Sequence, residues 1–310
     1  MFVSVIIPCL NVEEYIEDCL ASVYNQSYKQ FEVICIENNS KDNTLSKLRG
    51  LEDDLYPDLI VLEESKPGAC AARNKGLSVA KGEWVQFLDA DDTLKPGKLE
   101  HQIKLLKSKK AISFVAGASE YVSSGGEVKV VIPQNGAPLL AVFVRELGNT
   151  CSNLWNRNVL NNANGWNEDL SSSQETDLMF RLLVLEKEVI IDHNPLTMIY
   201  ERISGQISQS NPIKRWSNFI DLRIKFLAEI KFSHPKTFTT YQSDFETFLL
   251  SSIIILSKYD RIRALGFLNK YHFNYKTIVL KYGIGKKILF CFKVFGPKTT
   301  LMIFSKRKNF

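Results

Sequence analysis

Histidine is scarce in this sequence and long apolar runs are missing, and each shortage excludes a class of protein. The 310 residues include four histidines, and none is paired at the spacing that zinc ligands need. The longest apolar stretch lies near 248–256 and is far shorter than the roughly 20 residues that cross a bilayer. We therefore expect neither a zinc enzyme nor an integral membrane protein.

Cysteine pairs of the CxxC type are also missing. The six cysteines are scattered among strand-like and helix-like segments, which is typical of small apolar residues in a reducing compartment. The first apolar run, residues 2–10, has no basic region before it and is interrupted by Pro8, so it does not have the form of a signal peptide. We therefore expect a cytoplasmic protein.

Acidic residues are missing from the end of the chain. Residues 261–310 contain twelve Lys or Arg and no Asp or Glu, which leaves 27 basic and 34 acidic residues before position 261. Lysines are mixed with large apolar residues over 281–308, as in segments that lie on anionic membranes, where each cation contributes about 1 kcal/mol. A helical region with a solvated basic face, or a surface that forms a homo-oligomer, would have the same pattern. No nucleic-acid-binding motif accompanies the basic residues, so we expect no nucleic-acid partner.

Strand-like and helix-like segments alternate along the first hundred residues. Apolar strands are expected at 3–8, 31–36, 59–62 and 84–88, and helices at 44–51 and 69–80. A further helix is expected to start at Asn11, with Glu14 as its capping-box partner. This alternation predicts an α/β fold with a mostly parallel sheet flanked by helices on both faces. The later part of the chain is mainly helical, so we expect two domains, at 1–210 and 211–310.

Three carboxylates follow the fourth expected strand within four residues, at Asp89, Asp91 and Asp92. Open α/β sheets bind their ligands at the carboxyl ends of their strands. Like charges this close repel one another unless a cation lies nearby, and Mg²⁺ usually takes one or two carboxylates together with substrate phosphates. The cluster therefore predicts a site for a divalent cation and a phosphorylated ligand.

Two other interpretations of the cluster are open. A solvated acidic turn or a helix cap explains one aspartate better than three. The run from Asp89 to Thr93 also fits the DxDx[TV] pattern of haloacid-dehalogenase-type phosphatases, in which Asp89 would be the nucleophile. That family carries its motif on its first strand, whereas here the motif follows the fourth, so we rank the phosphatase below the metal–phosphate site.

Several short motifs in the first half of the chain resemble those of family-2 glycosyltransferases, which have the GT-A fold. They are VSVIIPCLN at 3–11, SVYNQSY at 22–28, FEVICI at 31–36, ARNKG at 72–76 and KGEW at 81–84, followed by the aspartate cluster. The resemblance covers about residues 1–210. It implies inverting transfer of a sugar from a nucleotide-sugar donor to a glycan or lipid-linked acceptor, assisted by Mn²⁺ or Mg²⁺, as in bacterial polysaccharide synthesis. Because many such transferases use lipid-linked acceptors, it also favours a peripheral position of the basic tail at the inner face of the cell membrane.

The resemblance assigns roles to individual residues. Asp89 and Asp91 would bind the ribose, the diphosphate and the metal, with Asp91 as the more direct metal ligand. Arg73 would bind the diphosphate through two hydrogen bonds, as guanidinium groups do. Arg202 lies in a segment, 200–208, that resembles the flexible segment over the donor and lacks its histidine, so Arg202 would contact the diphosphate instead. The donor site would thus include Pro8, Glu37, Asn39, Arg73, Asp89, Ala90, Asp91 and Arg202.

The turn after the second expected strand departs from the family pattern. Residues 37–40 read ENNS where the family usually has Asp-Asp-Gly-Ser, whose first acid accepts a hydrogen bond from the nucleobase. Glu37 keeps that acid, and a carboxylate acceptor suits the N3–H donor of uracil, so a UDP-sugar is the expected donor. The changes at Asn38 and Gln174 leave open an alternative, a non-catalytic glycan- or membrane-binding protein with this fold.

The expected catalytic base is Glu175. Residues 174–178 read QETDL where the family has Glu-Asp-x-Asp-Leu, whose second acid removes the proton of the acceptor hydroxyl. Asp177 is the second candidate, although an acid in the first turn of a helix needs no catalytic role. Trp155 and Trp166 are expected either to stack on an acceptor sugar or to belong to the core.

Overall fold

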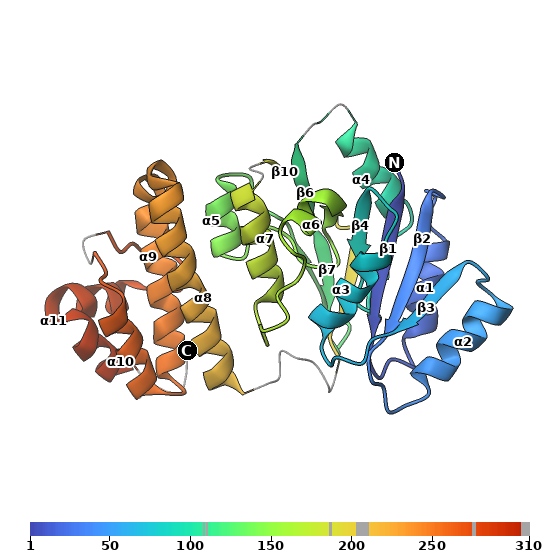
Figure 1. Cartoon of the computed structure of the whole chain (residues 1–310). Coiled ribbons are helices and arrows are strands. Elements are labelled where there is room, and N and C mark those ends of the chain that lie inside the picture. The colour runs from blue at the N-terminus through green and yellow to red at the C-terminus, as the bar shows by residue number, and fades with distance from the viewer. Residues whose placement is uncertain (108, 110, 186–187, 203–210, 275–276, 305–310) are drawn as a thin grey trace. The chain divides into compact units, whose positions relative to one another are not determined.

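The structure is a computed structural model that describes the chain except at residues 108, 110, 186–187, 203–210, 275–276 and 305–310 (Figure 1). The chain forms two compact units. The first consists of Met1–Ala141, Arg145–Leu170 and Gln174–Ile203, and the second of Val142–Val144, Ser171–Ser173 and Ser204–Phe310. The expected domain boundary near residue 210 lies among the residues that are not described.

A seven-stranded sheet forms the centre of the first unit. Its strands are β1 (Val3–Cys9), β2 (Phe31–Glu37), β3 (Leu59–Glu63), β4 (Trp84–Phe87), β6 (Ile112–Gly117), β9 (Leu154–Asn156) and β10 (Glu188–Asp192). Their order is β10-β6-β9-β4-β1-β2-β3. Neighbouring strands are parallel except at β9, which is antiparallel to both β4 and β6. The expectation of a mostly parallel α/β sheet is therefore confirmed.

Helices cover both faces of this sheet (Figure 1). Val3, Val5 and Ile7 of β1 belong to one apolar core cluster, which also contains residues of three helices. These helices are α1 (Ile16–Tyr24), α2 (Thr44–Asp54) and α4 (Lys98–Leu106). Ile6 points to the other face, as the period of a strand requires, and packs there on α3 (Ala69–Val79). The approach is so close that a Cβ on Gly76 of α3 would lie 2.4 Å from Ile6 Cγ2.

The predicted start of the first helix at Asn11 is wrong. α1 begins at Ile16, and its N-cap residue makes no side-chain capping bond. Asn11 instead has a positive φ of 51°, and its Oδ1 accepts a hydrogen bond of 2.8 Å from the backbone N–H of Lys41. The backbone N–H of Asn11 in turn donates to Oγ of Ser40 at 3.0 Å. A tertiary contact between the loops after β1 and β2 thus takes the place of the local capping box.

A second, four-stranded sheet belongs to the same unit. Its strands are β5 (Thr93–Leu94), β7 (Ser119–Val122), β8 (Val128–Val131) and β11 (Thr197–Tyr200), and their order is β5-β11-β7-β8. β5 directly follows the aspartate cluster and pairs antiparallel with β11. This pairing brings the residues after β11 to the cluster. Three further helices of the chain are α5 (Pro138–Phe143), α6 (Arg157–Asn162) and α7 (Gln174–Leu185).

The second unit is mainly helical, as expected. Its helices are α8 (Pro212–Ser233), α9 (Pro235–Ser257), α10 (Arg261–Lys270) and α11 (Lys286–Phe304). The side chain of Asn211 caps α8 by accepting hydrogen bonds from two backbone N–H groups. Aromatic side chains contribute to the core, where the rings of Phe143 and Phe245 lie 5.0 Å apart between centroids. None of the helices in the described part has the length and apolar character that a bilayer crossing needs.

One cation lies deep in the core of the first unit. Lys98 of α4 is fully buried, and its Nζ donates a hydrogen bond to Oε1 of Gln86 in β4. Burial lowers the pKa of Lys98 from its ordinary 10.5 to about 7, although the charge of Asp192 acts in the opposite direction. A buried amine with this pKa makes the stability of the fold depend on pH.

We expect Lys98→Met to remove part of that pH dependence. Between pH 7 and 10.5 the unfolded chain binds more protons at this lysine than the native chain, so native stability rises with pH. One pKa unit corresponds to about 1.4 kcal/mol. Between pH 7 and 10.5 the free energy of unfolding of the wild type should therefore rise by several kcal/mol relative to that of Lys98→Met. Urea unfolding at a series of pH values measures the gain, with Lys104→Met, an exposed lysine of the same helix, as the control. A difference that stays constant with pH would contradict the prediction.

Candidate functional site

Arg73 and Asp89 form an ion pair at the carboxyl edge of the main sheet. Asp89 lies in the turn after β4, and its Oδ1 is 2.6 Å from Nη2 of Arg73. Arg73 projects from α3, is only 6% exposed, and has its guanidinium carbon 4.6 Å from the ring centre of Trp166. Burial acts to lower the pKa of Arg73, but the carboxylate of Asp89 outweighs it and holds that pKa above its ordinary value. A permanently charged guanidinium therefore faces the acidic turn.

Asp91 pairs with a second arginine. Its Oδ2 lies 2.5 Å from Nε of Arg202, which follows β11. The guanidinium carbon of Arg202 lies 4.5 Å from the ring centre of Tyr15, so an aromatic face supports the cation. Burial and the charge of Asp89 raise the pKa of Asp91, while Arg202 acts to lower it.

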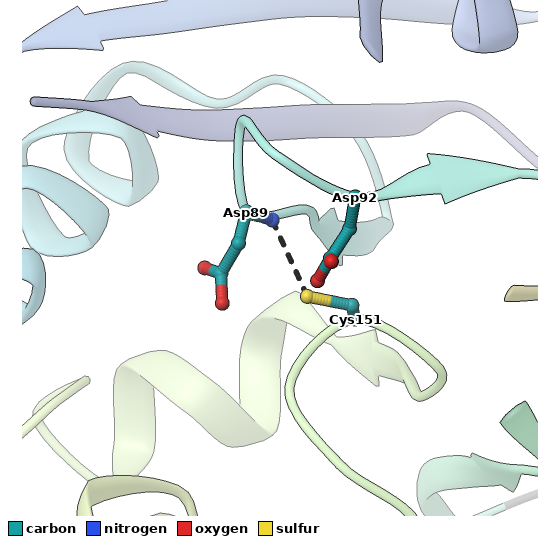
Figure 2. A group of neighbouring side chains, drawn as sticks. All are labelled: Asp89, Asp92 and Cys151. Carbon is teal, nitrogen blue, oxygen red and sulfur yellow. Dashed lines mark hydrogen bonds between the residues drawn. The ribbon is translucent and has the colours of Figure 1, made fainter. Parts of the chain in front are cut away.

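Asp92 is the most deeply buried member of the cluster, at 3% exposure. Its Oδ1 accepts a hydrogen bond of 3.0 Å from the backbone N–H of Tyr200. Figure 2 shows its carboxylate turned toward the sulfur of Cys151, while the carboxylate of Asp89 points away from that sulfur. Burial, and then the charges of the two other aspartates, raise the pKa of Asp92 well above its ordinary value. Asp92 thus ties the acidic turn to β11.

Cys151 contacts the acidic turn through a hydrogen bond, and the sequence did not predict it in the site. The backbone N–H of Asp89 donates to its Sγ at 3.3 Å (Figure 2). Ligand atoms of Asp89, Asp92 and Cys151 lie within 4.8 Å of one another, close enough to hold a metal ion. Burial raises the pKa of the Cys151 thiol well above its ordinary value, and sulfur is a softer ligand than the oxygens that Mg²⁺ and Mn²⁺ prefer. In this structure Cys151 accepts a hydrogen bond from the turn.

The carboxylates of the turn suit a hard divalent cation. Three carboxylates share the turn, whereas two guanidinium groups face them in the described part of the chain. Burial is the first cause of the raised pKa values of Asp91 and Asp92, and the neighbouring carboxylate charges are the second, a repulsion that an added cation would relieve. Mg²⁺ and Mn²⁺ prefer oxygen ligands. Because Asp92 is nearly inaccessible, the oxygens of Asp89 and Asp91 are the candidate ligands.

The turn after β2 lies beside this cluster in the sheet, because β2 neighbours β1, which neighbours β4. Glu37 is buried, and its Oε1 accepts a hydrogen bond of 2.5 Å from the backbone N–H of Ser40. Pro8 lies opposite Ile36 on the adjacent strand, and Ala90 is buried in the core cluster. The expected nucleobase acceptor thus has one oxygen engaged within its own turn.

Asn38 and Asn39 have a structural reason to replace the family's Asp-Gly pair. Nδ2 of Asn38 donates to the backbone oxygens of Glu64 and Lys66 at 2.7 and 2.8 Å, and its Oδ1 accepts from the N–H of Gly68. A carboxylate has no N–H to donate, so aspartate could not make the first two bonds. Asn39 has a positive φ of 67°, which suits glycine as well as asparagine, but its Nδ2 also donates to the backbone oxygens of Glu64 and Ser65 at 3.2 Å. The two amides fasten the end of β2 to the loop that leads into α3 and Arg73.

Glu175 and Asp177 both lie in the first turn of α7, but their surroundings differ. Asp177 is buried and pairs with Arg181 at 2.8 Å, and Nη1 of Arg181 also donates to the backbone oxygen of Ala163. Asp177 therefore stabilises α7 and, through Arg181, its contact with Ala163. Glu175 is half-buried, and its negative charge helps to raise the pKa of Tyr121, which burial chiefly raises to about 12.

Asn149 links Glu175's neighbour Tyr121 to the acidic turn, a connection that the sequence did not suggest. Its Nδ2 lies 3.3 Å from the hydroxyl oxygen of Tyr121, and its Oδ1 accepts a hydrogen bond of 2.9 Å from the backbone N–H of Cys151. Residues from four distant parts of the sequence meet here, so no local motif could have predicted them.

Both candidate acceptor-stacking tryptophans belong to the core. Trp155 and Trp166 are 0% and 2% exposed, and their ring centres lie 6.4 and 5.2 Å from that of Phe87. Of the two alternatives for these rings, the core is confirmed. Of the expected closing segment at 200–208, residues 203–208 lie outside the described part.

The fold and the site define a class of protein. The main sheet is mostly parallel, has one reversed strand and is flanked by helices, which is the GT-A architecture. Its strand β4 ends in an acidic turn that faces a buried arginine. The TarS protein of S. aureus, residues 1–349 in complex with UDP-GlcNAc, has this fold with a TM-score of 0.65 and 17% identity. The match covers 98% of this chain and 90% of that one.

Residues 4–150, just under half of the chain, match the sequence model of glycosyl transferase family 2, which confirms the resemblance to that family over this region. The putative teichuronic acid biosynthesis glycosyltransferase TuaG of Bacillus subtilis is 39% identical over 124 residues, which are 40% of this chain and 49% of TuaG. The Escherichia coli enzyme WfgD, a UDP-Glc:alpha-D-GlcNAc-diphosphoundecaprenol beta-1,3-glucosyltransferase, is 36% identical over 133 residues, which are 43% of this chain and 51% of WfgD. The chain thus spans about half the length of these two relatives, and 31% of the length of two others from Rickettsia.

Proposed function

We propose that the chain is a glycosyltransferase that moves a sugar from a UDP-sugar to a glycan or lipid-linked acceptor, with inversion and with the help of a divalent cation. The observation that carries this proposal is the ion pair of buried Arg73 with Asp89, next to Asp91 at the carboxyl edge of the sheet. Such an edge binds ligands in open α/β folds, and its paired cations and carboxylates suit a metal–diphosphate. The match of residues 4–150 to the family model supports the class of reaction.

The positions of these residues support the role that we propose for each. Arg73 is held by Asp89 and by the ring of Trp166, so its remaining N–H groups can bind a diphosphate oxygen without loss of side-chain freedom. Asp89 and Asp91 would hold the cation, which supplies positive charge to the leaving diphosphate. Glu175 takes the proton of the attacking acceptor hydroxyl. Because one base suffices for a single displacement, the expected product is inverted.

Uridine is the proposed nucleoside. Glu37 keeps one carboxylate oxygen that no described hydrogen bond occupies, and a carboxylate suits the N3–H of uracil. The similar enzyme WfgD is a UDP-Glc glucosyltransferase, and the similar TarS structure is a complex with UDP-GlcNAc. Both support a UDP-sugar and leave the choice of sugar to experiment.

The test is calorimetric titration of the chain with UDP, with and without Mn²⁺, followed by donor hydrolysis with a panel of UDP- and GDP-sugars. We expect UDP to bind in Mn²⁺ and to bind much more weakly in EDTA, since carboxylates alone repel a diphosphate. Hydrolysis of a UDP-sugar above that of GDP-mannose would support the nucleoside. Absence of any nucleotide binding would overturn the proposal and favour the non-catalytic alternative.

The haloacid-dehalogenase-type alternative rests on the sequence pattern at 89–93 alone. Its nucleophile would be Asp89, whose Oδ1 lies 2.6 Å from the buried Arg73, and the motif follows a central strand of the sheet. Phosphatase turnover that disappears in Asp89→Asn would revive it.

We further propose that the exposed residues of α11, a helix kinked at Gly296, lie on an anionic membrane, where a lipid-linked acceptor would be found. They include four lysines and five large apolar side chains, and the helix has no acidic residue. They are Lys286, Lys287, Lys293 and Lys298, with Phe290, Val294, Phe295, Met302 and Ile303. Cations beside apolar groups suit an interface of anionic headgroups and acyl chains.

The double variant Lys293→Gln/Lys298→Gln should weaken binding to anionic vesicles by about 30-fold at low salt, because each cation contributes about 1 kcal/mol. Co-sedimentation with vesicles that contain phosphatidylglycerol measures the effect. Lys81→Gln/Lys129→Gln, which removes two exposed lysines of the first unit, is the matched control. Equal binding of the wild type to neutral and anionic vesicles would contradict the membrane proposal and leave an oligomer surface, which sedimentation velocity tests.

A further inference from the structure

The guanidinium of Arg202 occupies the carboxylate oxygen that a metal would need. Its Nε lies 2.5 Å from Oδ2 of Asp91, and both side chains are only 16% exposed. Two features hold the arginine there. The ring of Tyr15 lies 4.5 Å below its guanidinium carbon, and the backbone N–H of the preceding residue, Glu201, donates to the oxygen of Val122 at 2.9 Å.

A divalent cation and this guanidinium compete at the same oxygen. Mg²⁺ binds oxygen at about 2.0–2.1 Å, and a positively charged group already lies 2.5 Å from Oδ2. The two positive charges repel each other strongly, because both side chains are largely shielded from water. A free cation at Oδ2 of Asp91 is therefore bound less tightly while Arg202 keeps its ion pair there.

A cation that arrives with a diphosphate meets a different situation. The diphosphate oxygens are acceptors for the displaced guanidinium, so the ion pair with Asp91 is exchanged for one with the ligand. Tyr15 can support the guanidinium in either position, since it touches the face of the group and not its N–H edge. The ion pair therefore weakens binding of the free metal far more than binding of the metal–nucleotide complex.

We propose that Arg202 is a tethered competitor for the metal position at Asp91, which makes the site select the metal–nucleotide complex over the free divalent cation. This inference deepens the proposed function and rests on it. Arg202 acts as a specificity-determining residue. The apparent affinity for the free metal is lowered by the fraction of molecules in which the ion pair between Arg202 and Asp91 is broken.

The test is a titration of the chain with Mn²⁺ in the absence of nucleotide. The electron paramagnetic resonance signal of free Mn²⁺ measures the binding. Arg202→Gln should bind Mn²⁺ about fivefold to tenfold more tightly than the wild type, the range expected for loss of a partly buried competing ion pair. In the presence of Mn²⁺ the same variant should bind UDP more weakly, because the diphosphate loses a positively charged hydrogen-bond donor. These opposite signs are the signature of competition, since a merely structural arginine would weaken both.

Two variants serve as controls. Arg49→Gln removes an arginine that pairs with Glu52 and Glu63 far from the turn, and it should leave the affinity for Mn²⁺ unchanged. Arg202→Lys should lie between the wild type and Arg202→Gln, because an ammonium keeps the charge but lacks the planar fork. Circular dichroism and melting curves confirm that each variant is folded.

Two results would overturn the inference. One is an Mn²⁺ affinity of Arg202→Gln equal to or weaker than that of the wild type. The other is that no variant binds Mn²⁺ while UDP still binds. That result would exclude a metal at Asp91 but keep the donor site. Loss of UDP binding by the wild type would instead be the failure of the proposed function.

Discussion

Glu175→Gln should abolish sugar transfer while leaving the affinity for UDP nearly unchanged. Glutamine has almost the shape of glutamate but cannot accept the proton of the acceptor hydroxyl. The rate should fall by about 10²–10⁴-fold, the usual contribution of a general base. Glu175 lies on α7 and takes no part in the ion pairs of Asp89 and Asp91, so nucleotide binding should not change. Single-turnover transfer and UDP titration on the same preparation measure both quantities.

Asp177→Asn is the matched control, since it makes the same chemical change two residues away. Asp177 pairs with Arg181 and is buried, so its loss should lower thermal stability and reduce transfer only as far as α7 moves. The two variants should therefore differ in kind, one in catalysis and the other in stability. Unchanged turnover in Glu175→Gln, together with loss of turnover in Asp177→Asn, would move the base to Asp177.

Asp91→Asn should remove the effect of Mn²⁺ on UDP binding. An amide is a much poorer ligand for a hard cation than a carboxylate, and the change also removes the partner of Arg202. In Mn²⁺, the affinity of the variant for UDP should fall to the value that the wild type has in EDTA. Transfer should fall by about 10²-fold or more, since charge stabilisation by a metal contributes several kcal/mol.

Asp53→Asn, an exposed carboxylate of α2, is the control for this change. It should leave both UDP binding and transfer as they are in the wild type. Nucleotide binding that ignores Mn²⁺ as well as Asp91→Asn would remove the metal from the proposed mechanism.

The strands and the order of the main elements could be predicted because their signals are local. The apolar runs that became β1, β2 and β4 are buried on both faces of the sheet, which makes them continuous and easy to recognise. The acidic turn after β4 was equally visible, as three like charges cannot follow a buried strand without a reason. The start of α1 could not be predicted, because the amide of Asn11 is used by Lys41, which is distant in sequence.

The roles of Glu175, Arg73 and Glu37 came from the resemblance to a family and not from periodicity. The structure adds contacts that bear on these roles. Arg73 has a carboxylate partner and an aromatic support, whereas Asp177 is tied to Arg181. The assignments themselves stay predictions until the variants are measured.

By itself the sequence determined the class of fold, the acidic turn on a strand end and the basic character of the tail, because these depend on residue type and on short-range spacing. Only the tertiary structure decided which charges neutralise one another. Asp89 meets Arg73, Asp91 meets Arg202 and Asp92 meets the backbone of Tyr200. Electrostatic interactions depend on distance in space, and these partners lie 16 to 111 positions apart along the chain.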